Sequence, residues 1–143
     1  MNTVSILLVE DHPGFAKALI TMLSQHPSLE IVAVAETAED AVEQLRELKV
    51  DLVLVDYSLP NTSGINLVAE LHEKYPDLRC IMLSGYLSIQ YARRAIETGA
   101  RGYLIKDNPA GILEGIQYVL NGGIYLSEEL RNLGPTDLQT DFT

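Results

Sequence analysis

The chain has little of what supports a disulfide framework or a metal cluster. Its 143 residues include one cysteine, Cys80, no tryptophan and two phenylalanines. A single cysteine excludes an intramolecular disulfide and argues against a cysteine-ligated metal cluster. Because Cys80 lies inside an apolar run, we expect a buried and unreactive thiol.

Basic residues are also scarce. Ten Lys and Arg stand against twenty Asp and Glu, which gives a formal net charge of −10 at pH 7. Contacts to nucleic acid phosphates require Lys and Arg, so this chain by itself is not expected to bind nucleic acid. No apolar run approaches the roughly 20 residues of a membrane-spanning helix. The start of the chain lacks the basic segment of a signal peptide. We therefore expect a cytoplasmic location and no membrane contact.

Short apolar runs are the strongest pattern that is present. Four of them, each followed at once by a polar residue, are Val4–Val9, Leu52–Val55, Cys80–Leu83 and Gly102–Ile105. Runs of this kind are typical of strands buried on both faces of a parallel sheet. A further run, Ile31–Ala35, predicts a strand near an edge of that sheet.

Apolar residues at helical spacing separate these runs and predict five helices. The helices are expected after Pro13-Gly14 as far as Leu23, after an N-cap at Thr37, from Ile65 to Tyr75, from Ser88 to Thr98, and from Pro109 to Gly122-Gly123. The length suits one domain. Alternating strands and helices predict an α/β fold of three layers, with helices on both faces of a five-stranded parallel sheet. The flavodoxin-like strand order 2-1-3-4-5 is the expected one.

The polar residues that follow the strands are expected to meet in one pocket. They are Glu10 and Asp11, Asp56, Ser84 and Lys106. In an open parallel sheet, ligands bind outside the carboxyl ends of the strands. Three carboxylates at one site repel one another unless a cation intervenes. Oxygen ligands in small number suit Mg²⁺, which we expect as the cofactor.

The pocket has the residues for phosphoryl transfer onto a carboxylate. Asp56 is the expected nucleophile because it ends the central strand, and carboxylates can attack phosphorus. Glu10 and Asp11 would hold the metal, while Lys106 would neutralise charge on the transferring group. Each position also has a structural alternative, such as Asp11 capping the next helix. For His12, a solvated loop residue is favoured over a place at the edge of the pocket.

The chain resembles the receiver domain of two-component response regulators over about residues 3–125. The resemblance is carried by Glu10-Asp11, Asp56-Tyr57-Ser58-Leu59-Pro60 with Gly64, Ser84, Lys106, and Tyr103 three residues before the lysine. The segments 99–107 and 122–127 resemble the NarL/FixJ-type subfamily, whose members normally carry a LuxR-type output domain.

The resemblance implies a CheY-like fold and a specific role for each of these residues. Asp56 would accept a phosphoryl group from a sensor histidine kinase or a small acyl phosphate. The backbone carbonyl of Ser58 would help to bind Mg²⁺. The Ser84 hydroxyl would then move to the phosphoryl oxygens, and Tyr103 would swing inward as the second switch residue. Asp107 stands where many receivers have proline, so a cis peptide is not assumed there.

The resemblance also implies partners. Phosphorylation is expected to promote a homodimer through the helix at 88–98, the strand at 102–105 and the helix that begins at Pro109. We expect a receiver domain over residues 1–126, and a linker or C-terminal tail over 127–143 that precedes a helix-turn-helix domain in a longer parent. Residues Ser127 to Leu130 could add a helical turn at its start. DNA binding would belong to that absent domain. A stand-alone regulator acting through protein partners is the alternative.

Two other functional classes fit the sequence less well. A phosphatase of the haloacid-dehalogenase type would need a second acid where Ser58 stands. A nucleotide-binding module would need a glycine-rich loop after the first strand, where Glu10-Asp11 stands instead. We therefore expect a signalling domain, not an enzyme, that catalyses only its own phosphorylation and dephosphorylation.

Overall fold

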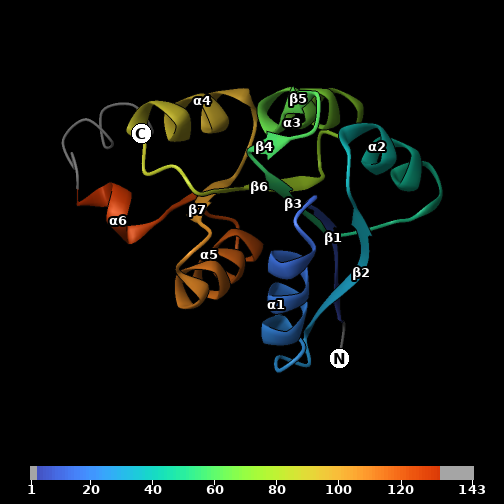
Figure 1. The fold of residues 1–143 in the computed structure, drawn as a ribbon, viewed down its shortest axis with the longest axis horizontal. Coiled ribbons are helices and arrows are strands. Elements are labelled where there is room, and N and C mark those ends of the chain that lie inside the picture. The colour runs from blue at the N-terminus through green and yellow to red at the C-terminus, as the bar shows by residue number, and fades with distance from the viewer. Residues whose placement is uncertain (1–2, 133–143) are drawn as a thin grey trace.

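Two layers of helices enclose a parallel sheet (Figure 1). The computed structural model describes residues 3–132. The strands are β1 Val4–Val9, β2 Leu29–Ala35, β3 Leu52–Asp56, β4 Ser58–Leu59, β5 Thr62–Ser63, β6 Arg79–Ser84, β7 Gly102–Ile105 and β8 Tyr125–Leu126. The helices are α1 Pro13–Leu23, α2 Ala38–Glu47, α3 Gly64–Lys74, α4 Ile89–Thr98, α5 Pro109–Leu120 and α6 Glu128–Arg131.

The main sheet has the order β2-β1-β3-β6-β7-β8, and all of its strand pairs are parallel. The first five strands follow the predicted order, and β2 lies at an edge as expected. The predicted count of five strands was wrong, because β8 adds a sixth beside β7 through the pairs Gly102↔Tyr125 and Tyr103↔Leu126. A strand of two residues is too short to show any hydrophobic period. The remaining strands, β4 and β5, form a small antiparallel hairpin after β3.

The sheet separates two apolar cores, one on each face. Helices α2, α3 and α4 lie on one side of the sheet, and α1 and α5 lie on the other (Figure 1). Because side chains alternate along a strand, neighbouring residues enter different cores. Val53 and Val55 pack under α3 and α4, whereas Leu52 and Leu54 pack against α1 and α5. This alternation explains why β3 is buried at every position.

Short polar side chains start several helices, and Thr37 is the predicted one among them. The Thr37 hydroxyl accepts a hydrogen bond from the Asp40 N–H at the start of α2, at 3.0 Å. Ser88 caps α4 and Asn108 caps α5 in the same way. These caps satisfy backbone donors that the first turn leaves without a partner.

Packing continues beyond Leu126, where a linker was expected. Ser127 is buried and Leu130 of α6 is fully buried. The Arg131 Nε donates to the Leu126 carbonyl at 2.9 Å. Residues 127–132, the first part of the expected linker, therefore pack on the domain, and a helical turn forms there as α6. The rest of the expected tail, residues 133–143, lies outside the described residues.

Gly64 allows the start of α3 to approach the end of β3. Its N–H donates to the Tyr57 carbonyl at 2.7 Å. A Cβ at this position would overlap the backbone carbonyl oxygen of Asp56. The loop between Asp56 and α3 can close only around a residue without a side chain.

We predict that Gly64→Ala lowers the free energy of unfolding by about 1–3 kcal/mol, because the backbone of Asp56 must shift to admit the methyl group. Gly14→Ala is the matched control, since a Cβ on Gly14 meets nothing within 4 Å. Alanine there should be neutral or stabilising, by up to about 1 kcal/mol. Urea denaturation measures both changes, and equal stabilities of the two variants would contradict the close approach.

Candidate functional site

The carboxyl ends of β1, β3, β6 and β7 meet at one edge of the sheet, as the sequence predicts. Lys106, directly after β7, is the centre of this group. Its Nζ lies 2.8 Å from Glu10 Oε1 and 3.3 Å from Asp56 Oδ2. Glu10, Asp56 and Lys106, which are far apart in the chain, thereby form one cluster.

Asp56 is almost completely buried, with 3% of its side chain exposed. Its Oδ1 accepts a hydrogen bond from the Ser58 N–H at 3.2 Å. Burial, together with the negative charge of Glu10, raises the pKa of Asp56 to about 6, and the charge of Lys106 offsets only part of this. The carboxylate is thus held in an environment that disfavours its negative charge.

Glu10 is buried too, yet its ionised form is favoured. Burial by itself raises the pKa of Glu10, but hydrogen bonds from Lys106 and His12 outweigh it and hold the pKa below its ordinary value. The pKa values of these two neighbouring carboxyl groups are therefore shifted in opposite directions by their surroundings.

Lys106 is positioned by α1 as well as by the two carboxylates. Its Nζ lies 4.5 Å from the centre of the Phe15 ring, a cation–π contact. Its backbone N–H donates to the Ser84 carbonyl at 2.9 Å. The peptide between Lys106 and Asp107 is trans, since none of the described peptide bonds is cis.

His12 lies at the edge of the pocket, contrary to the expectation of a solvated loop histidine. Its Nδ1 is 2.7 Å from Glu10 Oε2, 3.3 Å from Asp11 Oδ1 and 3.7 Å from Asp56 Oδ2. Hydrogen bonding to Glu10 and the charge of Asp11 raise the pKa of His12. The prediction was half right, because 63% of the side chain is exposed to solvent.

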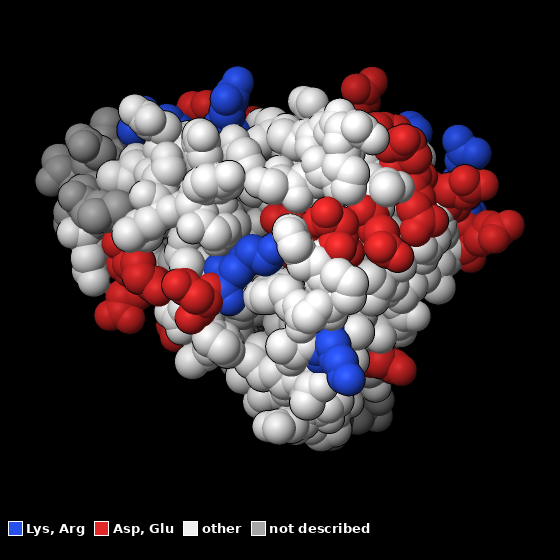
Figure 2. All heavy atoms as spheres, viewed as in Figure 1, with Lys and Arg blue, Asp and Glu red and all other residues white. Residues whose placement is uncertain are grey.

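Four residues of the pocket can share one cation. The donor atoms of Glu10, Asp11, His12 and Asp56 all lie within 4.8 Å of one another. Three of the four are carboxylates, a donor set that suits a hard divalent cation such as Mg²⁺. On the surface, acidic side chains form a band from the middle of the face shown in Figure 2 toward the α2 side.

Ser84 and Tyr103 both bind the backbone of Tyr86. The Ser84 Oγ accepts a hydrogen bond from the Tyr86 N–H at 2.9 Å, and the Tyr103 hydroxyl donates to the Tyr86 carbonyl at 2.7 Å. Tyr103 is fully buried, and burial raises the pKa of its phenol to about 12. The side chain of Tyr103 thus already points inward while Ser84 holds the loop after β6.

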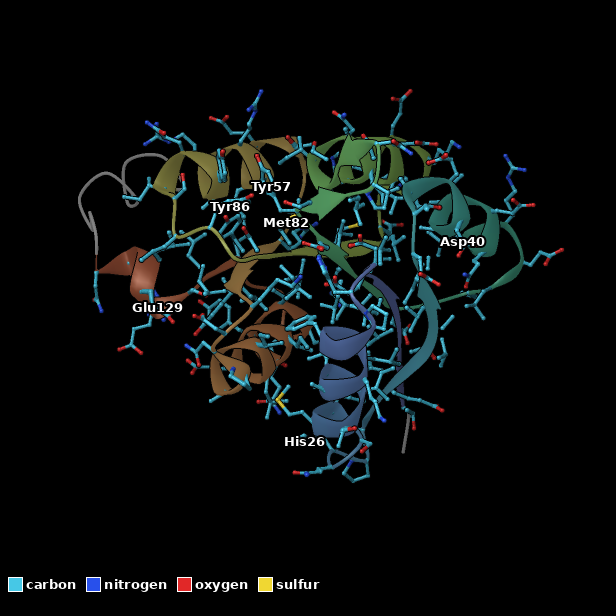
Figure 3. The ribbon with its side chains drawn as sticks, viewed as in Figure 1. His26, Asp40, Tyr57, Met82, Tyr86 and Glu129 are labelled. Carbon is cyan, nitrogen blue, oxygen red and sulfur yellow. The ribbon has the colours of Figure 1, made fainter. Side chains whose placement is uncertain are left out.

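A cluster of tyrosines beside Asp56 was not predicted. Tyr57 and Tyr86 lie side by side above the sheet (Figure 3), with ring centroids 6.2 Å apart. Tyr57 stacks on Tyr91 at 4.8 Å and meets the edge of Tyr103 at 6.5 Å. The four residues come from separate segments, so no periodicity could reveal the cluster. The only hint in the sequence is its seven tyrosines among few other aromatic residues.

Cys80 lies in the core, as its apolar run predicts. It is buried, and burial raises the pKa of its thiol to about 12.

Among residues 3–132, no helix combines the length and apolar character needed to cross a membrane.

Comparisons with known proteins show the family of the chain. The profile of the family described as "Response regulator receiver domain" matches residues 6–117. The transcriptional regulatory protein DegU of Brevibacillus brevis is 32% identical over 126 residues, which are 87% of this chain and 53% of DegU. The DNA-binding transcriptional activator DevR/DosR of Mycobacterium tuberculosis is 35% identical over 104 residues, which are 73% of this chain and 48% of that protein. The chain thus spans about half the length of these relatives.

Solved structures give the same result. A LuxR-family two-component response regulator from Aurantimonas sp. SI85-9A1 superposes with a TM-score of 0.90 at 27% identity, covering 96% of this chain and 99% of that one. A CheY-like receiver domain protein from Methanospirillum hungatei gives a TM-score of 0.73, also at 27% identity, covering 84% and 95%. The family profile spans most of the sequence, and the fold superposes on these solved structures. This chain therefore belongs to the response regulator receiver domains.

Proposed function

We propose that Asp56 of this receiver domain accepts a phosphoryl group from a sensor histidine kinase. The observation that carries this proposal is the position of its carboxylate, buried at the end of the central strand and 3.3 Å from Lys106 Nζ. A carboxylate with a pKa of about 6 is ionised at neutral pH and can act as a nucleophile.

The proposed reaction forms one bond and breaks one bond. A carboxylate oxygen of Asp56 bonds to phosphorus while the bond from phosphorus to the donor nitrogen breaks, and the donor imidazole keeps that electron pair. Lys106 stabilises the negative charge on the transferring oxygens. In dephosphorylation, the oxygen of a water molecule bonds to phosphorus while the bond from phosphorus to the Asp56 oxygen breaks. Asp56 keeps that electron pair, and the water gives up a proton as inorganic phosphate leaves.

Glu10, Asp11 and Asp56 would hold Mg²⁺ through their side chains, and Ser58 through its backbone carbonyl. When bound, Mg²⁺ supplies positive charge that offsets the three carboxylates and the phosphoryl oxygens. The short distance from the Ser58 N–H to Asp56 Oδ1 supports a place for Ser58 beside the site. His12 extends the donor set at the solvent side.

Ser84 and Tyr103 are the proposed switch residues. Phosphorylation replaces a carboxylate by a group with more negative charge and strong hydrogen-bond acceptors. The Ser84 hydroxyl would leave the Tyr86 N–H for a phosphoryl oxygen, and the loop that Tyr103 also binds would then rearrange. The affected elements, α4, β7 and α5, form the proposed homodimer face.

The proposed output is transcription regulation by a longer parent protein. DegU and DevR/DosR are both named as transcriptional regulators, and this chain matches about half of each. With a net charge of −10, the chain itself is poorly suited to bind DNA. DNA binding would therefore belong to a separate domain of the parent, and the receiver would control it.

We predict that acetyl phosphate with Mg²⁺ adds one phosphoryl group to the wild-type protein and none to Asp56→Asn, because the amide is not a competent nucleophile. Intact-protein mass spectrometry measures the product. Asp107→Asn is the matched control, since Asp107 is an exposed carboxylate next to the site, and it should label like the wild type. Equal labelling of Asp56→Asn would refute Asp56 as the acceptor.

The raised pKa of Asp56 predicts a pH-dependent loss of stability. Folding raises this pKa from 3.8 to about 6, so the folded state binds the proton more tightly than the unfolded state. The contribution of Asp56 to stability is then present below about pH 4 and lost as the pH rises through 6. At pH 7.5 without metal, Asp56→Asn should be more stable than the wild type by about 2–3 kcal/mol.

Urea denaturation between pH 4 and pH 7.5 tests this difference, which should shrink toward pH 4. Mg²⁺ should stabilise the wild type at pH 7.5 by mass action and stabilise Asp56→Asn less. A difference that stays constant with pH would show that the ionised Asp56 carboxylate carries no penalty in the fold.

A further inference from the structure

Ser127 lies at the end of β8, beside the segment that carries Lys106. It follows β8 directly and is 2% exposed. Its N–H donates to the Tyr103 carbonyl at 3.1 Å, and its Oγ accepts from the Ile105 N–H at 3.0 Å. One residue thus binds both a proposed switch residue and the neighbour of Lys106.

The hydroxyl of Ser127 replaces a backbone acceptor. In a parallel ladder that continued past β8, the next rung would join the Ile105 N–H to the carbonyl of residue 127. That carbonyl instead accepts from the N–H groups of Leu130 and Arg131 in α6. The side chain therefore satisfies a buried donor that the turn into α6 would leave without a partner.

Glu129 makes a second connection to the same segment. Its Oε2 accepts from the Asn108 Nδ2 at 3.0 Å. The other side-chain atom of Asn108, Oδ1, accepts from the Gly111 N–H and caps α5. Figure 3 shows Glu129 on α6, at the side of the molecule where α5 begins. Residues 105 and 108, on both sides of Lys106, are thus joined to residues 127 and 129.

The residues that make these bonds are themselves well anchored. Leu130 is fully buried, and Tyr125 and Leu126 are nearly so. The Arg131 guanidinium lies 5.3 Å from the centre of the Tyr125 ring and also donates to its hydroxyl at 3.3 Å. The segment 125–131 therefore has enough packing of its own to hold the residues against which it lies.

We propose that Ser127 and Glu129 are positioning residues for Lys106. They hold residues 105–108 in the conformation from which the Lys106 side chain reaches Glu10 and Asp56. This inference rests on the proposed function, because it gives Lys106 a part in phosphoryl transfer. Since energetic coupling between two sites is reciprocal, a phosphoryl group that binds Lys106 stabilises α6 in return.

The first test compares Ser127→Ala with Ser127→Thr, which keeps the hydroxyl. The initial rate of phosphorylation by acetyl phosphate and Mg²⁺ should fall roughly three- to tenfold in Ser127→Ala, because small displacements of a charged catalytic group reduce rates steeply. Ser127→Thr should restore most of the rate. Thermal melts establish that each variant is folded at the assay temperature.

The second test uses two adjacent carboxylates of α6 and remains informative if Ser127→Ala does not fold. Glu129→Ala removes the acceptor of Asn108 and should also lower the rate, by roughly twofold or more. Glu128→Ala removes an equal charge from the same helix at an exposed position, and it should phosphorylate at the wild-type rate. Equal rates for these two variants and the wild type, with Ser127→Ala also unchanged or unfolded, would overturn the proposal.

Hydrogen–deuterium exchange supplies a readout that general destabilisation would not reproduce. Phosphorylation should slow exchange in residues 125–132 of the wild type and leave that segment of Glu129→Ala less protected at equal occupancy of Asp56. Full phosphorylation without any change in residues 125–132 would overturn this inference and leave the proposed function intact. A wild-type protein that takes no phosphoryl group would instead overturn the proposed function, and this inference with it.

Discussion

The contact of Lys106 with Glu10 and Asp56 is the interaction on which the rest of the site depends. Two buried carboxylates this close repel each other, and burial adds to the cost of each charge. Lys106, directly after β7, provides the compensating charge. The two carboxyl groups respond differently, since the pKa of Glu10 is lowered and that of Asp56 is raised. The pocket therefore retains an unbalanced negative charge at Asp56, which a cation or a change of charge there can relieve.

The fold supplies this contact by placing strand ends side by side. Four neighbouring parallel strands, β1, β3, β6 and β7, end at one edge of the sheet. The residues that directly follow these strands therefore lie close together. Gly64 then allows the chain to turn closely over Asp56, and the Phe15 ring of α1 contacts the ammonium group of Lys106. The rigid sheet sets the distances, whereas the loops after the strands carry the groups that can move.

Much of this arrangement could be predicted from the sequence because its signals are local or periodic. Buried strands read as continuous apolar runs, helices as apolar residues with a period near 3.6, and Thr37 as a cap from its position before a helix. The rule that ligands bind at the carboxyl ends of parallel strands then brought Glu10, Asp56 and Lys106 together. The features that were missed lack such signals. The pair of residues in β8 and the tyrosines around Tyr57 show no period, and their partners are distant in the chain.

The sequence by itself determined the order of the five longer strands and the five longer helices, the identity of the chemical groups and the strand end that carries each of them. Hydrophobic pattern and residue chemistry are properties of the chain, and they do not depend on how its elements pack. Only the tertiary structure decided which atoms touch. It placed His12 against three carboxylates, turned Tyr103 inward onto the carbonyl of Tyr86, and put the Ser127 hydroxyl on the N–H of Ile105. Such contacts depend on side-chain rotamers and on loop paths that differ by a few ångströms, which local sequence patterns do not encode.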